Sequence, residues 1–223
     1  MVVDMESRKI YPASFTYVLN ISAIPGPIMR SLALNQLEQA LRSGSFLVDC
    51  RPTNDFADSH IPGSISASIN GSYEYMVNCI FSNDKHIIVI AEDERQSEAI
   101  LRLETEGYSN LSSFDFEVWK SSENETSKIK RCFAQDSVKH HDNMVDVNNS
   151  EDWEVLHVKN VLNVPLADLV NQPSKIKEGD VLYCGNGHKS MAAASFMAIR
   201  GVNVSDIVGG LSAILVDAPE LEI

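Results

Sequence analysis

The sequence predicts an α/β protein built from two copies of one unit, each organised around a parallel sheet. Asp49 and Asp146 lie 97 residues apart, and His60 and His157 share that offset, as does an aromatic residue between them. In each half, a short run of apolar residues precedes a tight loop and a stretch with helical composition. Strand, loop and helix in alternation are typical of a parallel sheet.

The strands are predicted from short β-branched or apolar runs. Ile87–Ile90 is such a run, as expected for a strand buried on both faces, and residues 180–183 are its counterpart. Residues 110–116 and 203–208 are predicted to form the strand that follows the helix in each copy.

Two helices are predicted from their composition and from the glycines that end them. They cover residues 97–106, before Gly107, and residues 190–200, before Gly201. Met191 and Met197 lie on the second helix, and we interpret them as core residues.

The repeat sets the predicted domain boundaries. Residues 1–28 are read as an extended lead-in, 29–119 as the first domain, 120–128 as a linker and 129–223 as the second domain. The linker is assigned because it is polar and has no apolar period.

Composition excludes several classes of function. The net charge of −13 argues against binding to nucleic acid and to an anionic membrane surface. No apolar run is long enough to span a bilayer, and no signal peptide is recognised, so a cytoplasmic location is expected. The four cysteines are far apart, which indicates neither a disulfide framework nor a zinc site.

The motifs resemble a known family. The first copy contains Asp49-x-Arg51, an aromatic residue and then His60-Ile-Pro-Gly. The second contains a strand that ends in Tyr-Cys, a glycine loop and a Gly-Gly turn. In this order, the motifs are similar to those of rhodanese (sulfurtransferase) domains. The resemblance covers residues 31–217. It implies two tandem rhodanese-like domains, each a five-stranded parallel sheet flanked by helices.

The resemblance also implies a catalytic cysteine, which maps to Cys184. The residues expected to bind substrate are Gly185, Asn186, Gly187, His188, Lys189 and Ser190. The matching loop of the first copy, residues 91–96, holds no cysteine and three consecutive carboxylates, so that copy is expected to be inactive.

Sulfur transfer suits such a loop. A thiolate is the attacking form of cysteine, and backbone N–H groups at a helix N-terminus stabilise negative charge. Lys189 and His188 are expected to add positive charge and to favour an anionic donor such as thiosulfate, a thiol persulfide or mercaptopyruvate. Cys184 would carry the sulfur as a persulfide to cyanide, sulfite or a thiol, with no metal or organic cofactor.

The second copy departs from the family pattern. Asn148 stands where the family has arginine, residues 157–160 have lost the His-Ile-Pro-Gly motif, and Lys189 stands where many relatives have arginine. These changes predict a slow enzyme or an uncommon donor. We interpret Asp49, Arg51 and His60, and Asp146 and His157, as structural.

Three alternatives remain at this point. The chain could be a non-catalytic persulfide carrier or regulatory interaction module. A dual-specificity phosphatase is disfavoured because the Cys-x5-Arg pattern would need arginine at Ser190. Residues 11–20 resemble the segment that joins metallo-β-lactamase-like persulfide dioxygenases to rhodanese repeats, which makes this chain a candidate part of such a fusion, or a partner of a separate dioxygenase. The dioxygenase metal motif is absent.

Overall fold

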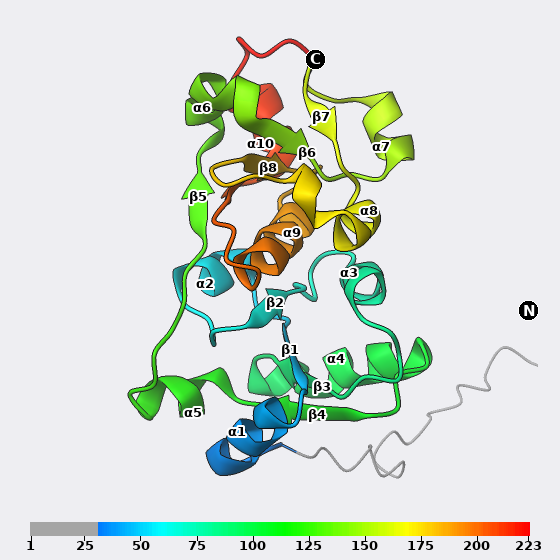
Figure 1. Cartoon of the computed structure of the whole chain (residues 1–223), viewed down its shortest axis with the longest axis vertical. Helices are drawn as coiled ribbons and strands as arrows, with labels where there is room; N and C mark the ends of the chain where they lie inside the picture. Colours follow the sequence, from blue (N-terminus) through cyan, green and yellow to red (C-terminus); the bar gives the residue numbers. More distant parts are fainter. Residues whose placement is uncertain (1–30) are drawn as a thin grey trace, which may run out of the picture.

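The computed structural model describes residues 31–223, which form two domains that each contain a parallel sheet flanked by helices (Figure 1). The predicted lead-in, residues 1–28, lies outside the described residues. The elements of the first domain are α1 (Leu34–Arg42), β1 (Phe46–Asp49), α2 (Thr53–Asp58), β2 (Ser64–Ser66), α3 (Tyr73–Ile80), β3 (Ile87–Ile90), α4 (Asp93–Thr105), β4 (Leu111–Phe114) and α5 (Phe116–Ser121).

The second domain repeats this order. Its elements are β5 (Lys130–Cys132), α6 (Ala134–Ser137), the 3-10 helix η2 (Val138–Asn143), β6 (Met144–Asp146), α7 (Ser150–Val155), β7 (Leu162–Asn163), α8 (Leu166–Asn171), the 3-10 helix η3 (Pro173–Lys175), β8 (Val181–Tyr183), α9 (His188–Ala198), β9 (Ser205–Ile207) and α10 (Gly210–Asp217).

The two sheets differ in strand number. The second sheet has five parallel strands in the order β5-β9-β8-β6-β7, as expected. Among residues 31–223, the first has four, in the order β2-β1-β3-β4, one fewer than the five expected for each domain. Within the described residues, the place of the fifth strand is taken by a single parallel bridge from Ser31 to Ser113 of β4, and the chain turns into α1 three residues later.

Helix α9 lies between the two domains (Figure 1). It packs on β8 and β9 of its own domain and on β2 of the first domain. Residues 190–197 of this helix are all buried, including Met191 and Met197, which are confirmed as core residues. A helix that is apolar on every side is typical of a fully enclosed position. The buried hydroxyl of Ser195 on this helix accepts a 3.0 Å hydrogen bond from the backbone N–H of Ser66, on β2 of the first domain.

The same apolar cluster continues through both domains. It joins Val48 and Val89 of the first sheet to Leu182 of the second through α9. At roughly 25 cal/mol per Å² of apolar surface, burial of one whole helix makes the domain contact a major contribution to stability. The two sheets therefore share one apolar core.

Polar contacts also tie the domains together. His60 and Ser127 exchange backbone hydrogen bonds of 3.0 and 2.9 Å, which place the segment after α5 against the first domain. Arg131 on β5 binds both carboxylate oxygens of Asp206 at 2.9 Å and also donates to Asn54 Oδ1 on α2.

The motif repeated at an offset of 97 residues has the same structure in both domains. His60 stacks on Phe56 with ring centroids 4.0 Å apart, and His157 stacks on Trp153 at 3.9 Å. In each case the histidine Nδ1 lies within 2.8 Å of the backbone oxygen of that aromatic residue. These histidines therefore close the end of α2 and of α7, in agreement with the structural role assigned to them.

Across residues 31–223, no helix is both long and apolar enough to cross a membrane. All four cysteines are free thiols.

Candidate active-site loop

Cys184 follows directly after β8, at the carboxyl end of the second sheet. Its side chain is fully buried. The backbone N–H of Gly187 donates to Sγ at 3.2 Å, and the thiol lies 3.7 Å from Ser190 Oγ on the first turn of α9. The sulfur thus faces the N-terminus of a buried helix, where N–H groups and the helix dipole favour a negative charge.

Glycines allow the loop to fold around the sulfur. Gly187 has φ +89°, in the left-handed region that favours glycine, and a Cβ at this position would lie 3.3 Å from the backbone N of Gly209. Gly210 approaches still more closely, since a Cβ at this position would lie 2.1 Å from the carbonyl oxygen of Cys184.

Helix α10 holds the first half of the loop. The N–H of Leu211 donates to the Cys184 carbonyl at 2.7 Å. The N–H and the hydroxyl of Ser212 both donate to the carbonyl of Gly185, at 3.0 and 2.9 Å. The Gly-Gly turn noted in the sequence therefore brings the N-terminus of α10 against the loop.

Asn148 is a contact of the loop that the sequence did not reveal. Its Oδ1 accepts the backbone N–H of Gly185 at 3.2 Å. Its backbone carbonyl accepts from Asn163 Nδ2 at 3.0 Å, and its N–H donates to Asp146 Oδ1 at 2.7 Å. The residue that replaces the family arginine therefore positions the residue next to Cys184.

Loss of the arginine alters the surroundings of Asp146. In the first domain, Arg51 binds both oxygens of Asp49 and donates to the Ser59 carbonyl at 2.8 Å. In the second domain, Asp146 Oδ2 has no hydrogen-bond partner within 3.5 Å among the described residues. Burial raises the pKa of Asp146, because the charged carboxylate loses hydration.

His188 packs against the first domain. A Cβ on Gly71 would lie 2.7 Å from Cγ of the His188 ring, so the glycine allows this close approach. Burial, followed by the charge of Arg131, lowers the pKa of His188. The ring is therefore neutral near pH 7, and its Nδ1 is buried without a hydrogen-bond partner in the described part of the chain.

Lys189 forms an ion pair. Its Nζ lies 3.0 Å from Asp152 Oδ2 and 3.2 Å from Asn149 Oδ1, both on or next to α7. On the other side, it lies 5.6 Å above the ring of Tyr75 from the first domain. Asn186 is the exposed member of the loop, while Gly187 and Ser190 are buried.

The corresponding segment of the first domain has a different backbone. Ala91 occupies the position of Cys184, and the helix begins early, at Asp93, so the expected loop over residues 91–96 is mostly the first turn of α4. The N–H groups of Arg95 and Gln96 both bond to the Glu92 carbonyl, at 2.8 and 3.1 Å. The segment is helical rather than a loop because no glycine interrupts it, so its N–H groups bond within the helix.

A cavity of about 330 Å³ lies at this end of the first sheet. Ala91 and Arg51 contribute to its wall, and Arg51 is already bound to Asp49. Its acidic lining residues are Asp55, Asp58, Glu92, Asp115 and Glu117. Arg51 and Lys120 are its basic lining residues, so the acidic groups outnumber them and the wall contains no cysteine.

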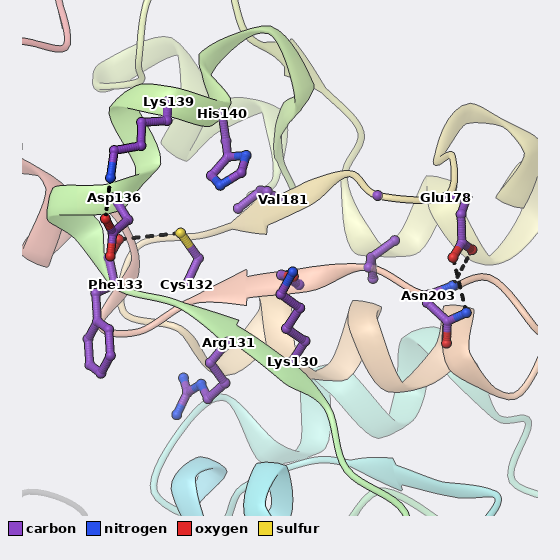
Figure 2. Close-up of a pocket in the computed structure, with 13 residues that line it drawn as sticks. Lys130, Arg131, Cys132, Phe133, Asp136, Lys139, His140, Glu178, Val181 and Asn203 are labelled. Carbon is purple, nitrogen blue, oxygen red and sulfur yellow. Dashed lines mark hydrogen bonds and ion pairs between the residues drawn. The ribbon is translucent and has the colours of Figure 1, made fainter.

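A second cavity, of about 420 Å³, lies away from Cys184 (Figure 2). It is bounded by β5 and by the first residues of β8 and β9, at the end of the second sheet opposite to the loop. Lys139 and Asp136 form a 2.9 Å ion pair at its edge. Among residues 31–223, no group of three or more His, Cys, Asp or Glu side chains is arranged to hold a metal ion.

Comparison with known proteins agrees with this architecture. The family model of the rhodanese-like domain matches twice, over residues 33–121 and 130–217. The chain is 31% identical over 72 residues to the "Putative sulfur carrier protein YrkF" of Bacillus subtilis, a match that covers 31% of this chain and 39% of that protein.

Solved structures with similarity to the chain include a thiosulfate sulfurtransferase from Pseudomonas aeruginosa, with 16% identity and a TM-score of 0.39 over 83% of this chain and 44% of that one. The rhodanese-like domain of the Alr3790 protein from Anabaena sp. has 22% identity and a TM-score of 0.41, over 46% of this chain and 81% of that one. At these TM-scores the structural likeness adds nothing to the argument.

The two family matches together cover most of the chain, and the protein therefore belongs to the rhodanese family, with two rhodanese-like domains in tandem. This family comprises sulfurtransferases and sulfur carriers, and the match to a sulfur carrier agrees with it.

Proposed function

We propose that the chain is a sulfurtransferase of the thiosulfate sulfurtransferase type, with a persulfide on Cys184 as the carrier. The observation that supports this most strongly is the placement of Cys184 at the end of β8, with its Sγ accepting the Gly187 N–H at 3.2 Å. Loop residues 185–190 are proposed to hold the donor and the transferred sulfur. The proposed donors are thiosulfate, a thiol persulfide or mercaptopyruvate.

The transfer takes place in two steps. The Cys184 thiolate attacks the outer sulfur of the donor, a new S–S bond forms, and the donor's own bond to that sulfur breaks, releasing sulfite, a thiolate or pyruvate. A nucleophilic acceptor such as cyanide, sulfite or a thiol then attacks the outer sulfur and regenerates the thiolate. Neither step needs an external oxidant, a metal or an organic cofactor.

Intact-protein mass spectrometry tests this proposal. The protein is incubated separately with thiosulfate, glutathione persulfide and mercaptopyruvate. We expect a gain of one sulfur atom, about 32 Da, with at least one donor. The gain should vanish in Cys184→Ser and persist in Cys132→Ser, which changes a half-buried thiol on β5. An equal gain in Cys184→Ser would overturn the proposal.

A second candidate function is supported by the burial of Cys184. A fully buried sulfur reacts with an external donor only after part of its cover moves, and a loop bonded to α10 and to Asn148 resists such movement. The chain would then be a persulfide carrier or regulatory module with little turnover. Sulfur accepted on Cys184 without multiple turnover would favour this reading.

The proposed partners are the small sulfur donor and acceptor, with a persulfide dioxygenase as a candidate protein partner. That part of the proposal depends on the resemblance of residues 11–20 to the dioxygenase–rhodanese junction, a segment outside the described residues. Nucleic acid and membranes are not proposed as partners, and the proposed location is the cytoplasm.

A further inference from the structure

The active-site loop carries a single permanent positive charge, and a carboxylate neutralises it. Between Cys184 and Ser190 the one Lys or Arg is Lys189. Its Nζ contacts Asp152 Oδ2 at 3.0 Å, and its side chain is 16% exposed, whereas that of Asp152 is 57% exposed. The ammonium is thus partly enclosed between Asp152 and the Tyr75 ring, and Asp152 is the more solvated partner.

The other groups near the loop do not supply a replacement. His188 is neutral near pH 7, because burial lowers its pKa. Asn148 is neutral and stands where the family has arginine. Arg131, whose charge acts on His188, is bound to both carboxylate oxygens of Asp206 at 2.9 Å. Besides Lys189, the positive feature next to the sulfur is therefore the backbone N–H of Gly187, which donates to Cys184 Sγ.

We propose that Asp152 is a specificity-determining residue, which neutralises Lys189 and thereby directs the Cys184 site toward sulfur donors that carry no charge on the reacting group. This inference rests on the proposed function of Cys184. The donor class it selects is an alkyl persulfide in its protonated form, R–S–SH, over thiosulfate, whose two negative charges lie on the group that reacts.

Binding in this loop costs a dianionic donor more free energy than it costs a neutral one. A dianion that enters this loop loses hydration and meets a cation already paired with a carboxylate, so little Coulomb energy compensates the loss. Exclusion of one donor by an unfavourable charge is a common basis of specificity. With R–S–SH, the Cys184 thiolate bonds to the outer sulfur, the S–S bond of the donor breaks, and R–S⁻ leaves with the electron pair, so the reaction balances without a further reagent.

The test compares two donors on three variants. Formation of the Cys184 persulfide is timed by intact mass spectrometry with thiosulfate and with the persulfide of 2-mercaptoethanol. Asp152→Asn should shift the ratio of the two loading rates toward thiosulfate by about tenfold, as expected for one unpaired charge near a dianion. The double variant Asp152→Asn/Lys189→Met should lose that shift, because no cation is left to be freed.

Asp136→Asn is the matched control. Like Asp152→Asn, it removes the carboxylate of a single lysine–aspartate pair in the second domain, here the 2.9 Å pair with Lys139 at the opposite end of the sheet (Figure 2). Its ratio of loading rates should equal that of the unchanged protein. High salt should also reduce the shift seen in Asp152→Asn, since mobile ions screen the attraction between a cation and an approaching dianion.

The outcomes separate the inference from the proposed function. Loading of Cys184 by both donors with a ratio that does not respond to Asp152→Asn would overturn the inference and leave the function standing. An equal shift in Asp136→Asn would overturn it as well, since the effect would then come from net charge alone. Failure of both donors to load Cys184 in every variant would overturn the proposed function, and the inference with it.

Discussion

Asn148 shows how one substitution changes the role of a position. Arg51, its counterpart in the first domain, binds Asp49, the Ser59 carbonyl and the face of Phe116. Asparagine is too short to bridge such distances, and its side chain turns instead to the Gly185 N–H. From the sequence, loss of the arginine was expected to weaken substrate affinity or the order of the loop; in the structure, Asn148 itself makes a contact that orients the loop.

Asn148→Ala tests this contact. The substitution removes the acceptor for the Gly185 N–H, while both backbone hydrogen bonds of residue 148 remain. We expect the rate of Cys184 persulfide formation to fall about fivefold, as for one hydrogen bond of ~1 kcal/mol. Asn171→Ala, which deletes an exposed amide bonded only within α8, is the control. Equal rates in all three proteins would contradict the positioning role.

At the scale of elements, the N-termini of two neighbouring helices hold the loop. The N-terminus of α9 faces the sulfur, and the N-terminus of α10 holds the carbonyl groups of Cys184 and Gly185. The two helices meet where Gly187 lies against Gly209 and where Gly210 lies against Cys184. The first domain lacks such a glycine, and its segment continues as a regular helix from Asp93.

Gly210→Ala tests whether this approach needs glycine. Both Gly210 and Gly201 have positive φ, +58° and +75°, but a Cβ on Gly201 meets no atom within 4 Å. Gly201→Ala should therefore lower the free energy of unfolding by about 1 kcal/mol through backbone strain alone. Gly210→Ala adds a clash with the Cys184 carbonyl and should cost at least 3 kcal/mol or prevent folding. Urea denaturation measures both; similar losses would contradict the close approach.

At the scale of the whole molecule, the first domain forms part of the surroundings of the Cys184 loop in the second. Its strand β2 covers α9, its Gly71 accommodates His188, and its Tyr75 lies beside Lys189. One apolar cluster runs through both domains. A helix buried on every side would expose a large apolar surface if either domain unfolded alone, so the two domains should unfold together.

The two tryptophans provide the measurement. Trp119 lies in α5 of the first domain and Trp153 in α7 of the second. In Trp119→Phe and in Trp153→Phe, fluorescence reports one domain and far-ultraviolet circular dichroism reports both. Within each variant, we expect both signals to give one urea midpoint. A fluorescence midpoint that differs from that of circular dichroism in either variant would show that the domains unfold independently.

The sequence by itself determined the duplicated α/β architecture and singled out Cys184. These features depend on local patterns: the β-branched run at Ile87–Ile90, the glycines that end helices, and the repeated Asp and His positions. Such patterns specify strands and helices because side-chain periodicity and backbone freedom act over a few neighbouring residues. The stacked pairs at His60 and His157 follow from the same local spacing.

Only the tertiary structure decided how the loop is charged and held. The pairing of Lys189 with Asp152, the bond from Gly185 to Asn148 and the packing of His188 on Gly71 join residues that are 37, 37 and 117 positions apart. Within residues 31–223, the bridge from Ser31 to Ser113 at the edge of the first sheet is also a pairing between distant positions. Local composition cannot specify such partners, because they depend on how the two sheets and α9 pack together.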